Sequence, residues 1–362
     1  MSDYFEIDFL DVESTKSGDA ITIRYSYNGN TYIHVVDGGF QDTGDKVKSH
    51  IKTHYENAEY IDHVVVTHQD GDHAGGLRTI LEEFVVGELW MLRPWLYSEE
   101  MIDRFSRFTS VENLEKRLKD IYSNLAALEE IALDKDIPIR EPFQGAQIGA
   151  FTVMSPTKDR FLDLVVQSEK TPESEKKEEA SQIGLGGMLT EAISRAVSLI
   201  RADWGKEVFS DEGTSAENEM SIVQFANLCD RRILLTGDTG RDGLTEAAEY
   251  APNIGLHLPG IDRFQVPHHG SRRNVSTELL DHWLGERLPS KPKKGEEKFR
   301  AFVSSAKKDK DHPRKAVIRA LIHRGAKVLT TEGQSLRTPY NAPDREGWSA
   351  AIPEEYPEEH EE

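Results

Sequence analysis

The chain has 362 residues, of which 37% are apolar and 30% are charged, so it can form a packed core and is not disordered throughout. Its 44 Lys and Arg residues against 64 Asp and Glu residues give a formal net charge of −20. This balance argues against a protein that coats nucleic acid through a basic face. A nuclease stays compatible with it, because an acidic metal site can lie beside a local basic groove.

The first strands of the chain lead toward one polar loop. Strands are expected over residues 5–9, 21–25, 32–36 and 61–66, and a helix over 43–57. Asn28-Gly29 is typical of a tight hairpin turn, because both residues tolerate a positive φ. The third strand ends at Asp37. The fourth is a short β-branched run, typical of a buried strand, and it delivers the chain directly into His68.

The pattern then changes from strands to helices. A helix is expected over residues 77–84 and a strand over 88–92. Beyond them, five apolar side chains are spaced by four and three residues, as on the buried face of an amphipathic helix: Leu114, Leu118, Ile121, Leu125 and Leu128. We therefore interpret about residues 98–135 as a helical insertion, which could offer a surface to a protein partner.

The second half of the chain predicts more strands and two segments of different character. Strands are expected over residues 151–154, 221–225, 233–236, 262–266, 301–304 and 327–331, and helices over 188–200 and 313–324. Residues 169–182 are highly charged and lack aromatic side chains, so we expect a solvated loop. Residues 341–362 form an acidic tail that we expect to be frayed. We assign residues 1–340 to a single domain.

Three further features bear on the class of protein. The start of the chain has no basic head followed by an apolar run, and no stretch approaches the ~20 apolar residues of a membrane span. A single cysteine, Cys229, excludes an internal disulfide. We therefore expect a cytoplasmic protein that does not span a membrane.

The strongest chemical signal lies directly after the buried strand 61–66. Four potential metal ligands fall within six residues there: His68, Asp70, Asp72 and His73. A loop at a strand end can direct several side chains toward one point, and imidazole together with carboxylate suits zinc, manganese or iron. A polar surface loop with two histidines would give the same residues. The following Gly75-Gly76 favours the metal site, because it lets the backbone pass close to it.

Two later polar groups also follow predicted strands. Asp238 ends the strand 233–236, where burial of a carboxylate is costly unless the group binds metal or accepts hydrogen bonds. Its position suits a bridge between two ions. His268 and His269 follow the strand 262–266, and one can bind metal while its neighbour contacts substrate. For either histidine alone, an ordinary loop role fits as well as a ligand role.

Taken in chain order, these motifs resemble the metallo-β-lactamase superfamily. The resemblance rests on Asp37 in VVDGG, the HxDxDH run from His68, Asp238 in LLTGD and His269 in HHGS. Further motifs are similar to the hydrolase domain of ComEC-type competence proteins: Phe9–Val12, Gly18–Ala20, Asn218, Ser221 and His312-Pro313. The similarity covers about residues 5–95 and 145–335. It implies an α/β (α+β) fold of αββα sandwich type, with metals at the strand ends and with the helical insertion added to it. DNA uptake is not implied, because the channel's membrane segments are absent.

The resemblance also implies a cofactor of two divalent ions, zinc or manganese. The first ion would be held by His68, Asp70 and Asp238, and the second by Asp72, His73, Asp238 and His269. Most superfamily members carry a histidine in place of Asp70, and another where this chain has Asn218 and Ser221. The first position is therefore rich in oxygen, and it should favour manganese or magnesium more than a three-histidine zinc site would. Asp37, Asn218 and Ser221 would orient the ligands from behind.

These residues predict a metal-dependent hydrolase, with a phosphodiesterase or nuclease as the preferred activity. Asp70 or Asp72 would orient the attacking water, and His268 would contact the substrate or deliver a proton to the leaving group. Ser271, Arg272, Lys308 and His312 are candidates for binding a nucleotide or nucleic acid, although the basic ones fit ordinary solvated charges equally well. One alternative is a hydrolase of a lactone, thioester or amide. A non-catalytic binding module is disfavoured, because every expected ligand position carries a usable group.

Overall fold

The structure is a computed structural model that describes residues 3–171 and 199–361. Two seven-stranded sheets form its centre. Sheet A contains, in spatial order, β15 (Leu336–Tyr340), β1 (Phe5–Phe9), β2 (Ala20–Tyr27), β3 (Asn30–Gly38), β4 (Tyr60–Val65), β5 (Val85–Trp90) and β6 (Ile139–Arg140). Sheet B contains β14 (Ala326–Thr330), β13 (Phe299–Val303), β12 (Arg263–Gln265), β11 (Arg231–Leu235), β10 (Val223–Leu228), β8 (Phe151–Ser155) and β7 (Gln147–Ile148).

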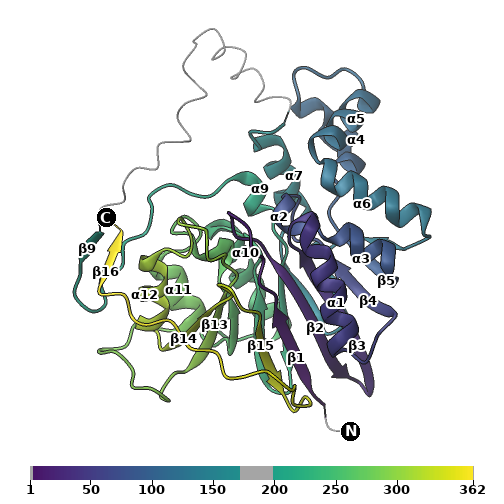
Figure 1. The fold of residues 1–362 in the computed structure, drawn as a ribbon. Coiled ribbons are helices and arrows are strands. Elements are labelled where there is room, and N and C mark those ends of the chain that lie inside the picture. Colours follow the sequence, from purple (N-terminus) through teal and green to yellow (C-terminus); the bar gives the residue numbers. More distant parts are fainter. Residues whose placement is uncertain (1–2, 172–198, 362) are drawn as a thin grey trace.

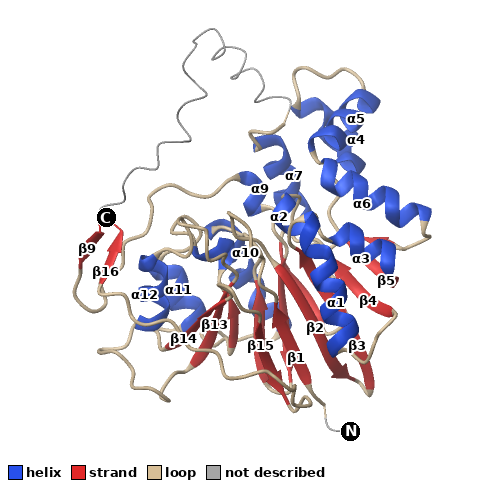
Figure 2. Ribbon diagram, viewed as in Figure 1, coloured by secondary structure: helices blue, strands red, loops and turns tan. Residues whose placement is uncertain are grey.

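Helices cover the outer face of each sheet (Figures 1 and 2). On the side of sheet A lie η1 (Gln41–Thr43), α1 (Gly44–His54), α2 (Gly71–Ala74) and α3 (Leu77–Glu83). On the side of sheet B lie α10 (Arg241–Tyr250), η5 (Ala251–Ile254), α11 (Thr277–Leu284) and α12 (Lys315–His323). The architecture is therefore the αββα sandwich expected from the sequence.

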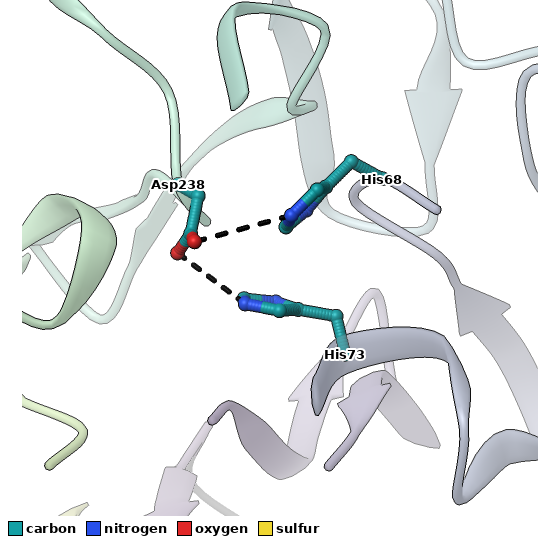
Figure 3. A group of neighbouring side chains, drawn as sticks. All are labelled: His68, His73 and Asp238. Atoms are coloured by element: carbon teal, nitrogen blue, oxygen red, sulfur yellow. Dashed lines mark ion pairs between the residues drawn. The ribbon is translucent and has the colours of Figure 1, made fainter. Parts of the chain in front are cut away.

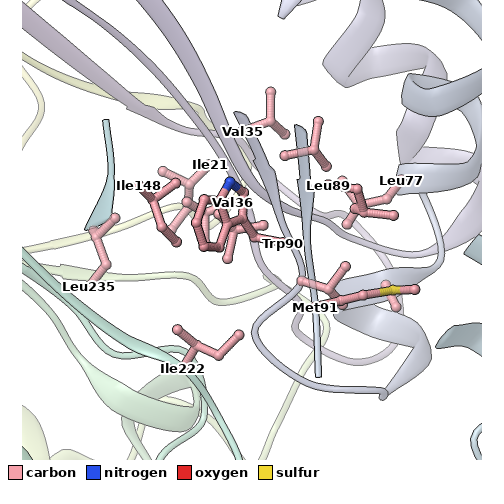
Figure 4. Close-up of a cluster of buried hydrophobic side chains, with 14 of the residues drawn as sticks. Ile21, Val35, Val36, Leu77, Leu89, Trp90, Met91, Ile148, Ile222 and Leu235 are labelled. Carbon is pink, nitrogen blue, oxygen red and sulfur yellow. The ribbon is translucent and has the colours of Figure 1, made fainter. Parts of the chain in front are cut away.

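The two sheets pack through a common apolar core, shown in Figure 4. Ile21 and Val36 of sheet A belong to the same buried cluster as Ile148 and Leu235 of sheet B, and none of the four is more than 1% exposed. Each such side chain stabilises the fold by about 1.5–3 kcal/mol relative to its exposed state. The apolar alternation along the strands is therefore what holds the two layers together.

The predicted helical segment lies outside the two sheets (Figure 1). It comprises η2 (Pro94–Tyr97), α4 (Ser98–Met101), η3 (Ile102–Arg104), α5 (Val111–Ile121) and α6 (Ser123–Asp134). Leu114, Leu118 and Leu128 are fully buried, as their spacing predicts, and α6 packs against α3. Helices thus form over this range without entering the space between the sheets.

Parallel strands in both sheets determine where the polar loops meet. Strands β3, β4, β5 and β6 run parallel in sheet A, and β11, β12, β13 and β14 run parallel in sheet B. The loops after β4, β11 and β12 carry His68, Asp238 and the histidine pair His268-His269, in the same order as in the sequence prediction. The short helix η6 (Pro267–Gly270) lies in the loop after β12, while α7 (Lys158–Gln167) follows β8 and α9 (Ala216–Glu219) precedes β10.

The prediction of a frayed tail is wrong for the described residues 341–361. Strand β16 (Glu359–Glu361) pairs antiparallel with β9 (Leu199–Arg201). The Glu361 carboxylate accepts the backbone N–H groups of Lys315 and Ala316 at 2.9 and 3.0 Å. A carboxylate at this position interacts favourably with the positive end of the α12 dipole. The acidic residues that suggested a solvated tail are thus partly used as specific acceptors.

Segments from both ends of the sequence meet at the edge of sheet A. Strand β1 pairs with β2 on one side and with β15, from the far end of the sequence, on the other. Glu6 and Asp8 on β1 are fully buried and bind Arg345 at 2.7 and 2.8 Å. Arg337 of β15 also pairs with Glu6 at 2.7 Å. The first strand is therefore fixed by residues that follow it by more than 300 positions.

Some elements differ from the sequence predictions or lie outside the described residues. The prediction did not include helices α7, α10 and α11 or strand β15. Most of the charged run 169–182 and of the expected helix 188–200 lies outside the described residues, and residues 199–201 are a strand rather than the end of a helix. No helix in the described part of the chain is long and apolar enough to cross a membrane.

A buried ion pair fastens the segment before α9 to the helices over sheet B. The Glu207 carboxylate accepts hydrogen bonds from Arg324 at 2.7 and 3.1 Å and from Thr277 at 2.7 Å. The side chains of Glu207 and Arg324 are 1% and 0% exposed. Burial alone would raise the pKa of Glu207, but His323 and Arg324 lower it to about 2.

We expect Glu207→Gln to lower the free energy of unfolding by about 3–5 kcal/mol at pH 7, because Arg324 keeps a buried charge without its partner. The depressed pKa means that the stabilisation is complete above the ordinary value of 4.5 and is lost as the pH falls toward about 2. Urea unfolding of both proteins at pH 7 and pH 3 measures this, and the difference between them should narrow at pH 3. As a control, Glu212→Gln removes an exposed pair with Arg273 and should cost under about 1 kcal/mol. An equal loss in both variants would contradict the prediction.

Candidate metal centre

The polar loops converge at one end of the sandwich. Figure 3 shows the His68 and His73 rings directed at the Asp238 carboxylate. Nε2 of His73 lies 3.3 Å from Oδ1 of Asp238, and Nε2 of His68 lies 3.9 Å from Oδ2. Nε2 of His269 lies 3.8 Å from the same Oδ2 atom and 3.6 Å from Oδ2 of Asp72. Residues far apart in the sequence thus surround one buried carboxylate.

These separations are typical of metal ligands rather than of hydrogen-bonded pairs. N–H···O bonds span about 2.7–3.2 Å, whereas two ligands at ~2.1 Å from a tetrahedral ion lie ~3.4 Å apart. Nε2 of His68, His73 and His269 and Oδ1 of Asp238 are all buried without a hydrogen-bond partner. Buried polar atoms without a partner are costly, and a single divalent cation would satisfy several of them together. The residues therefore fit a divalent metal.

The ligand atoms form overlapping groups rather than two separate sets. His68, His73 and Asp238 form one group, and Asp72, His73 and His269 form another. The predicted division had assigned His73 to the second ion alone. Its Nε2 atom is within reach of both groups, which places it between the two positions.

Residues behind the ligands determine which ring nitrogen faces the site. Nδ1 of His73 lies 2.8 Å from Oδ2 of Asp37, and Nδ1 of His269 lies 2.8 Å from the carbonyl oxygen of Ser304. Both partners accept, so both Nδ1 atoms carry the proton. The Thr67 hydroxyl donates to Asp37 at 2.6 Å and lies 3.1 Å from Nδ1 of His68. Each ring is thereby held with Nε2 directed into the site, where that nitrogen binds metal once it is deprotonated.

The HHGS loop holds two histidines in a strained backbone conformation. His268 and His269 have φ values of 46° and 53°, in the left-handed region. This conformation costs roughly 1–2 kcal/mol for each residue with a Cβ atom. At the next residue, Gly270, a Cβ atom would lie 2.8 Å from Cβ of Pro313. The loop is thus compressed between β12 and the segment before α12, and both imidazoles are turned toward Asp238.

Charge at the centre is arranged around Asp238. Burial alone would raise its pKa, but His73, His268 and His269 hold it well below the ordinary value. Burial also lowers the pKa of His268 to about 4. Burial would lower the pKa of His269 as well, but Asp238 and Asp72 raise it to about 9. The carboxylate at the centre is therefore ionised, which is the state that binds a cation.

Asp70 and Asp72 lie at the open side of the centre. Their side chains are 33% and 25% exposed, whereas that of Asp238 is 4% exposed. Oδ2 of Asp70 lies 3.8 Å from Nε2 of His68, and its Oδ1 accepts from Lys170 at 3.0 Å. The partial exposure gives both carboxylates access to solvent as well as to the ligand groups.

The polar residues Asn218 and Ser221 support the centre from behind. The Ser221 hydroxyl accepts the backbone N–H of Asp238 at 3.2 Å. The Asn218 amide lies 3.0 Å from Nδ1 of His268. Asn274, which sequence reasoning missed, donates to the carbonyl oxygens of Asp238 and Thr239, and its oxygen lies 3.2 Å from Nδ1 of His268. Nothing in the sequence near Asn274 indicates this role, because it lies in an irregular loop.

Among the four candidates Ser271, Arg272, Lys308 and His312 for substrate binding, His312 is brought to the centre, beside His268. Its ring stacks on that of His268, with centroids 5.4 Å apart. The Ser271 hydroxyl instead accepts the N–H of Arg273, and Arg272 contacts the carbonyl oxygen of Glu361 at 3.5 Å. Lys308 is exposed in the loop before His312.

Asp19 is a potential ligand that the sequence prediction did not name. It is 1% exposed, its Oδ2 accepts from Gln265 at 3.0 Å, and its Oδ1 is buried without a partner. It forms a possible ligand group with Asp238 and His269. The hairpin register could have revealed it, because the start of β2 lies beside the end of β3, where Asp37 stands.

Comparisons with known proteins agree with this centre. Residues 18–110, which include the HxDxDH run, match the family model of the metallo-β-lactamase superfamily. A search of curated proteins found no match.

Three solved structures are among those with a related shape. They are the hydrolase AbOPH of the β-lactamase superfamily (10% identity, TM-score 0.26, covering 61% of this chain and 56% of that one), the metallo-β-lactamase SMB-1 bound to 2-mercaptoethanesulfonate (8%, 0.31, 75% and 84%) and CmlA, a diiron β-hydroxylase from Streptomyces venezuelae (12%, 0.33, 91% and 44%). The similarity thus spans only about half the length of AbOPH and of CmlA.

Residues 18–110 thus match the metallo-β-lactamase superfamily model, and the αββα sandwich with histidines and aspartates gathered at its strand ends is the arrangement expected from that resemblance.

Proposed function

We propose that the chain is a metal-dependent hydrolase that cleaves phosphodiester bonds, as a nuclease or a nucleotide phosphodiesterase. The observation that carries this proposal is the convergence of histidine nitrogens and aspartate oxygens, without hydrogen-bond partners, around Asp238. The carboxylates of Asp70, Asp72 and Asp19 make this donor set richer in oxygen than a three-histidine site. Such a set suits the harder ions, manganese above zinc, that accompany phosphate chemistry.

In this proposal two divalent ions would be held by His68, Asp70 and Asp238 and by Asp72, His73, Asp238 and His269, with His73 also within reach of the first group. When bound, they lower the pKa of water and stabilise the charge that develops on a phosphodiester. Asp70 and Asp72 are placed at the exposed side to orient the attacking water. His268 and His312, stacked on each other, form the wall that contacts the substrate. The net charge of −20 favours a small nucleotide, or a nucleic acid presented by a partner, over a long free polyanion.

The proposed activity is tested with protein loaded separately with manganese and zinc. We expect hydrolysis of bis-p-nitrophenyl phosphate, with a higher rate for manganese, and no comparable hydrolysis of a lactone, thioester or amide panel. Activity on the lactone panel alone would overturn the phosphodiester proposal and favour the other hydrolase. A loaded protein that hydrolyses neither class would remove the enzymatic proposal itself.

Asp238→Ala should abolish hydrolysis, by about 100-fold or more, and should lower the metal content by at least one ion. Two divalent ions a few Å apart repel each other strongly, and a bridging carboxylate offsets that repulsion. Metal analysis and the rate on bis-p-nitrophenyl phosphate measure the two effects, with circular dichroism to check the fold. Asp242→Ala, an exposed aspartate four residues further on, is the matched control and should retain both metal and rate. Full metal content in Asp238→Ala would refute the bridging role.

His268→Ala should retain metal and lose about 100-fold in rate, because we assign His268 to the substrate. By contrast, His269→Ala should lose metal, because its Nε2 atom faces both Asp72 and Asp238. Metal stoichiometry of the two single variants separates the roles of these neighbours. If His268→Ala loses an ion and His269→Ala does not, the two assignments must be exchanged.

A further inference from the structure

A row of basic side chains crosses sheet B at the end opposite the metal centre. Arg263, Arg300 and Lys327 are direct register neighbours on the parallel strands β12, β13 and β14. Neighbouring strands lie ~4.8 Å apart, so the row places three like charges side by side. Like charges on directly opposite positions destabilise a sheet unless something compensates them.

The row faces the space between the sheets. Arg300 and Lys327 share a sheet face with Phe302 and Leu329, which belong to the core between sheets A and B. The Thr338 hydroxyl of β15, in sheet A, accepts from Arg263 at 2.7 Å and from Arg300 at 3.4 Å. One neutral oxygen thus lies between two guanidinium groups, at a position where an anion would be more favourable.

No carboxylate within the described residues forms an ion pair with these three side chains. Neighbouring Arg337 and Arg345 differ, because they are paired with the buried Glu6 and Asp8. Burial together with the nearby Arg300 lowers the pKa of Arg263 to about 10, a sign of this uncompensated charge. In a chain with a net charge of −20, such a cluster stands out.

A cavity of about 360 Å³ adjoins the row. Its lining includes Arg300, Lys327, Arg337 and Arg345, and its single acidic lining residue is the exposed Asp344. Trp348 contributes an aromatic wall. This volume lies in the range of small-molecule sites, about 300–1,000 Å³. Guanidinium groups present planar forks of donors that match phosphate oxygens.

We propose that this cavity, which we call the basic cavity, binds a small anion with two or more phosphoryl groups, either free polyphosphate or the phosphate chain of a nucleotide. The proposal does not depend on the proposed hydrolase activity. Arg263 begins β12, and His268 follows that strand, so the two sites are separated by about 16 Å along five extended residues. The basic cavity is therefore distinct from the metal centre.

Binding is measured by titration calorimetry on protein stripped of metal with a chelator, at low salt, with inorganic pyrophosphate, ADP and adenosine. We expect pyrophosphate and ADP to bind with one site per chain, and adenosine not to bind. Tighter binding of ADP than of pyrophosphate would assign the site to nucleotides. Equal binding of the two would assign it to free polyphosphate. Absence of pyrophosphate and ADP binding, or equal binding of adenosine, would overturn the proposal.

Variants locate the binding. Arg300→Met and Lys327→Met should each weaken pyrophosphate binding by about tenfold or more, whereas Lys294→Met, an exposed lysine outside the basic cavity, should leave it unchanged. Asp238→Ala should bind pyrophosphate as tightly as the wild type does. Pyrophosphate that bound at the metal centre would instead bind more weakly to this variant. Without ligand, Lys327→Met should melt no lower than wild type, because it relieves repulsion. The assignment of pyrophosphate to the basic cavity would be refuted if Arg300→Met and Lys327→Met both bound it unchanged. It would also be refuted if Asp238→Ala lost as much binding as they do.

Discussion

The buried carboxylate of Asp238 is the constraint on which the rest of the site depends. A lone carboxylate in a protein interior is strongly disfavoured unless it meets positive charge or hydrogen-bond donors. Around Asp238 the Nε2 atoms of four imidazoles lie 3.3–3.9 Å from its carboxylate oxygens without forming a hydrogen bond. Asp37, Thr67 and Ser304 fix the rings of His73, His68 and His269, respectively, through contacts with their Nδ1 atoms. The surrounding residues thus keep open a space that a cation fills.

The sandwich makes this arrangement possible because its parallel strands end at one edge. The loops after β4, β11 and β12 carry polar residues beyond the last paired position of each strand, and the apolar core fixes the strands relative to one another. The strained backbone of His268 and His269 is held in place by Pro267 and Gly270 on either side and by Pro313, which packs against Gly270. Local conformations that are unfavourable alone persist because the two layers hold the loop ends in place.

Much of the fold and of the ligand set could be predicted from the sequence, and the failures have physical causes. Strand alternation and the run from His68 to His73 are local patterns, so they predicted β1 to β4 and the main ligands. Asp19 was not predicted as a ligand, because its place near the centre depends on the pairing of β2 with β3 across a hairpin. The orientation of the Arg272 side chain was not predicted, because it depends on a contact with Glu361, almost 90 residues away in the sequence. The order of the tail was not predicted, because its composition suggests solvation, whereas Glu361 accepts backbone N–H groups at the start of α12 and Arg345 pairs with the buried Asp8.

The position of β1 between β2 and β15 has a consequence for the order of assembly. While the chain is being synthesised, β1 emerges first and lacks its second neighbour until residue 340 has been made. During that interval Glu6 and Asp8 cannot reach Arg337 and Arg345, and an unpaired strand edge is open to pairing with other chains. Closure of sheet A is therefore a late, long-range event, of the kind that makes folding slow. The charged side chains of Glu6 and Asp8 on the unpaired strand also disfavour pairing with other chains. The carboxylates that anchor the finished sheet therefore lower the risk of aggregation before β15 is made.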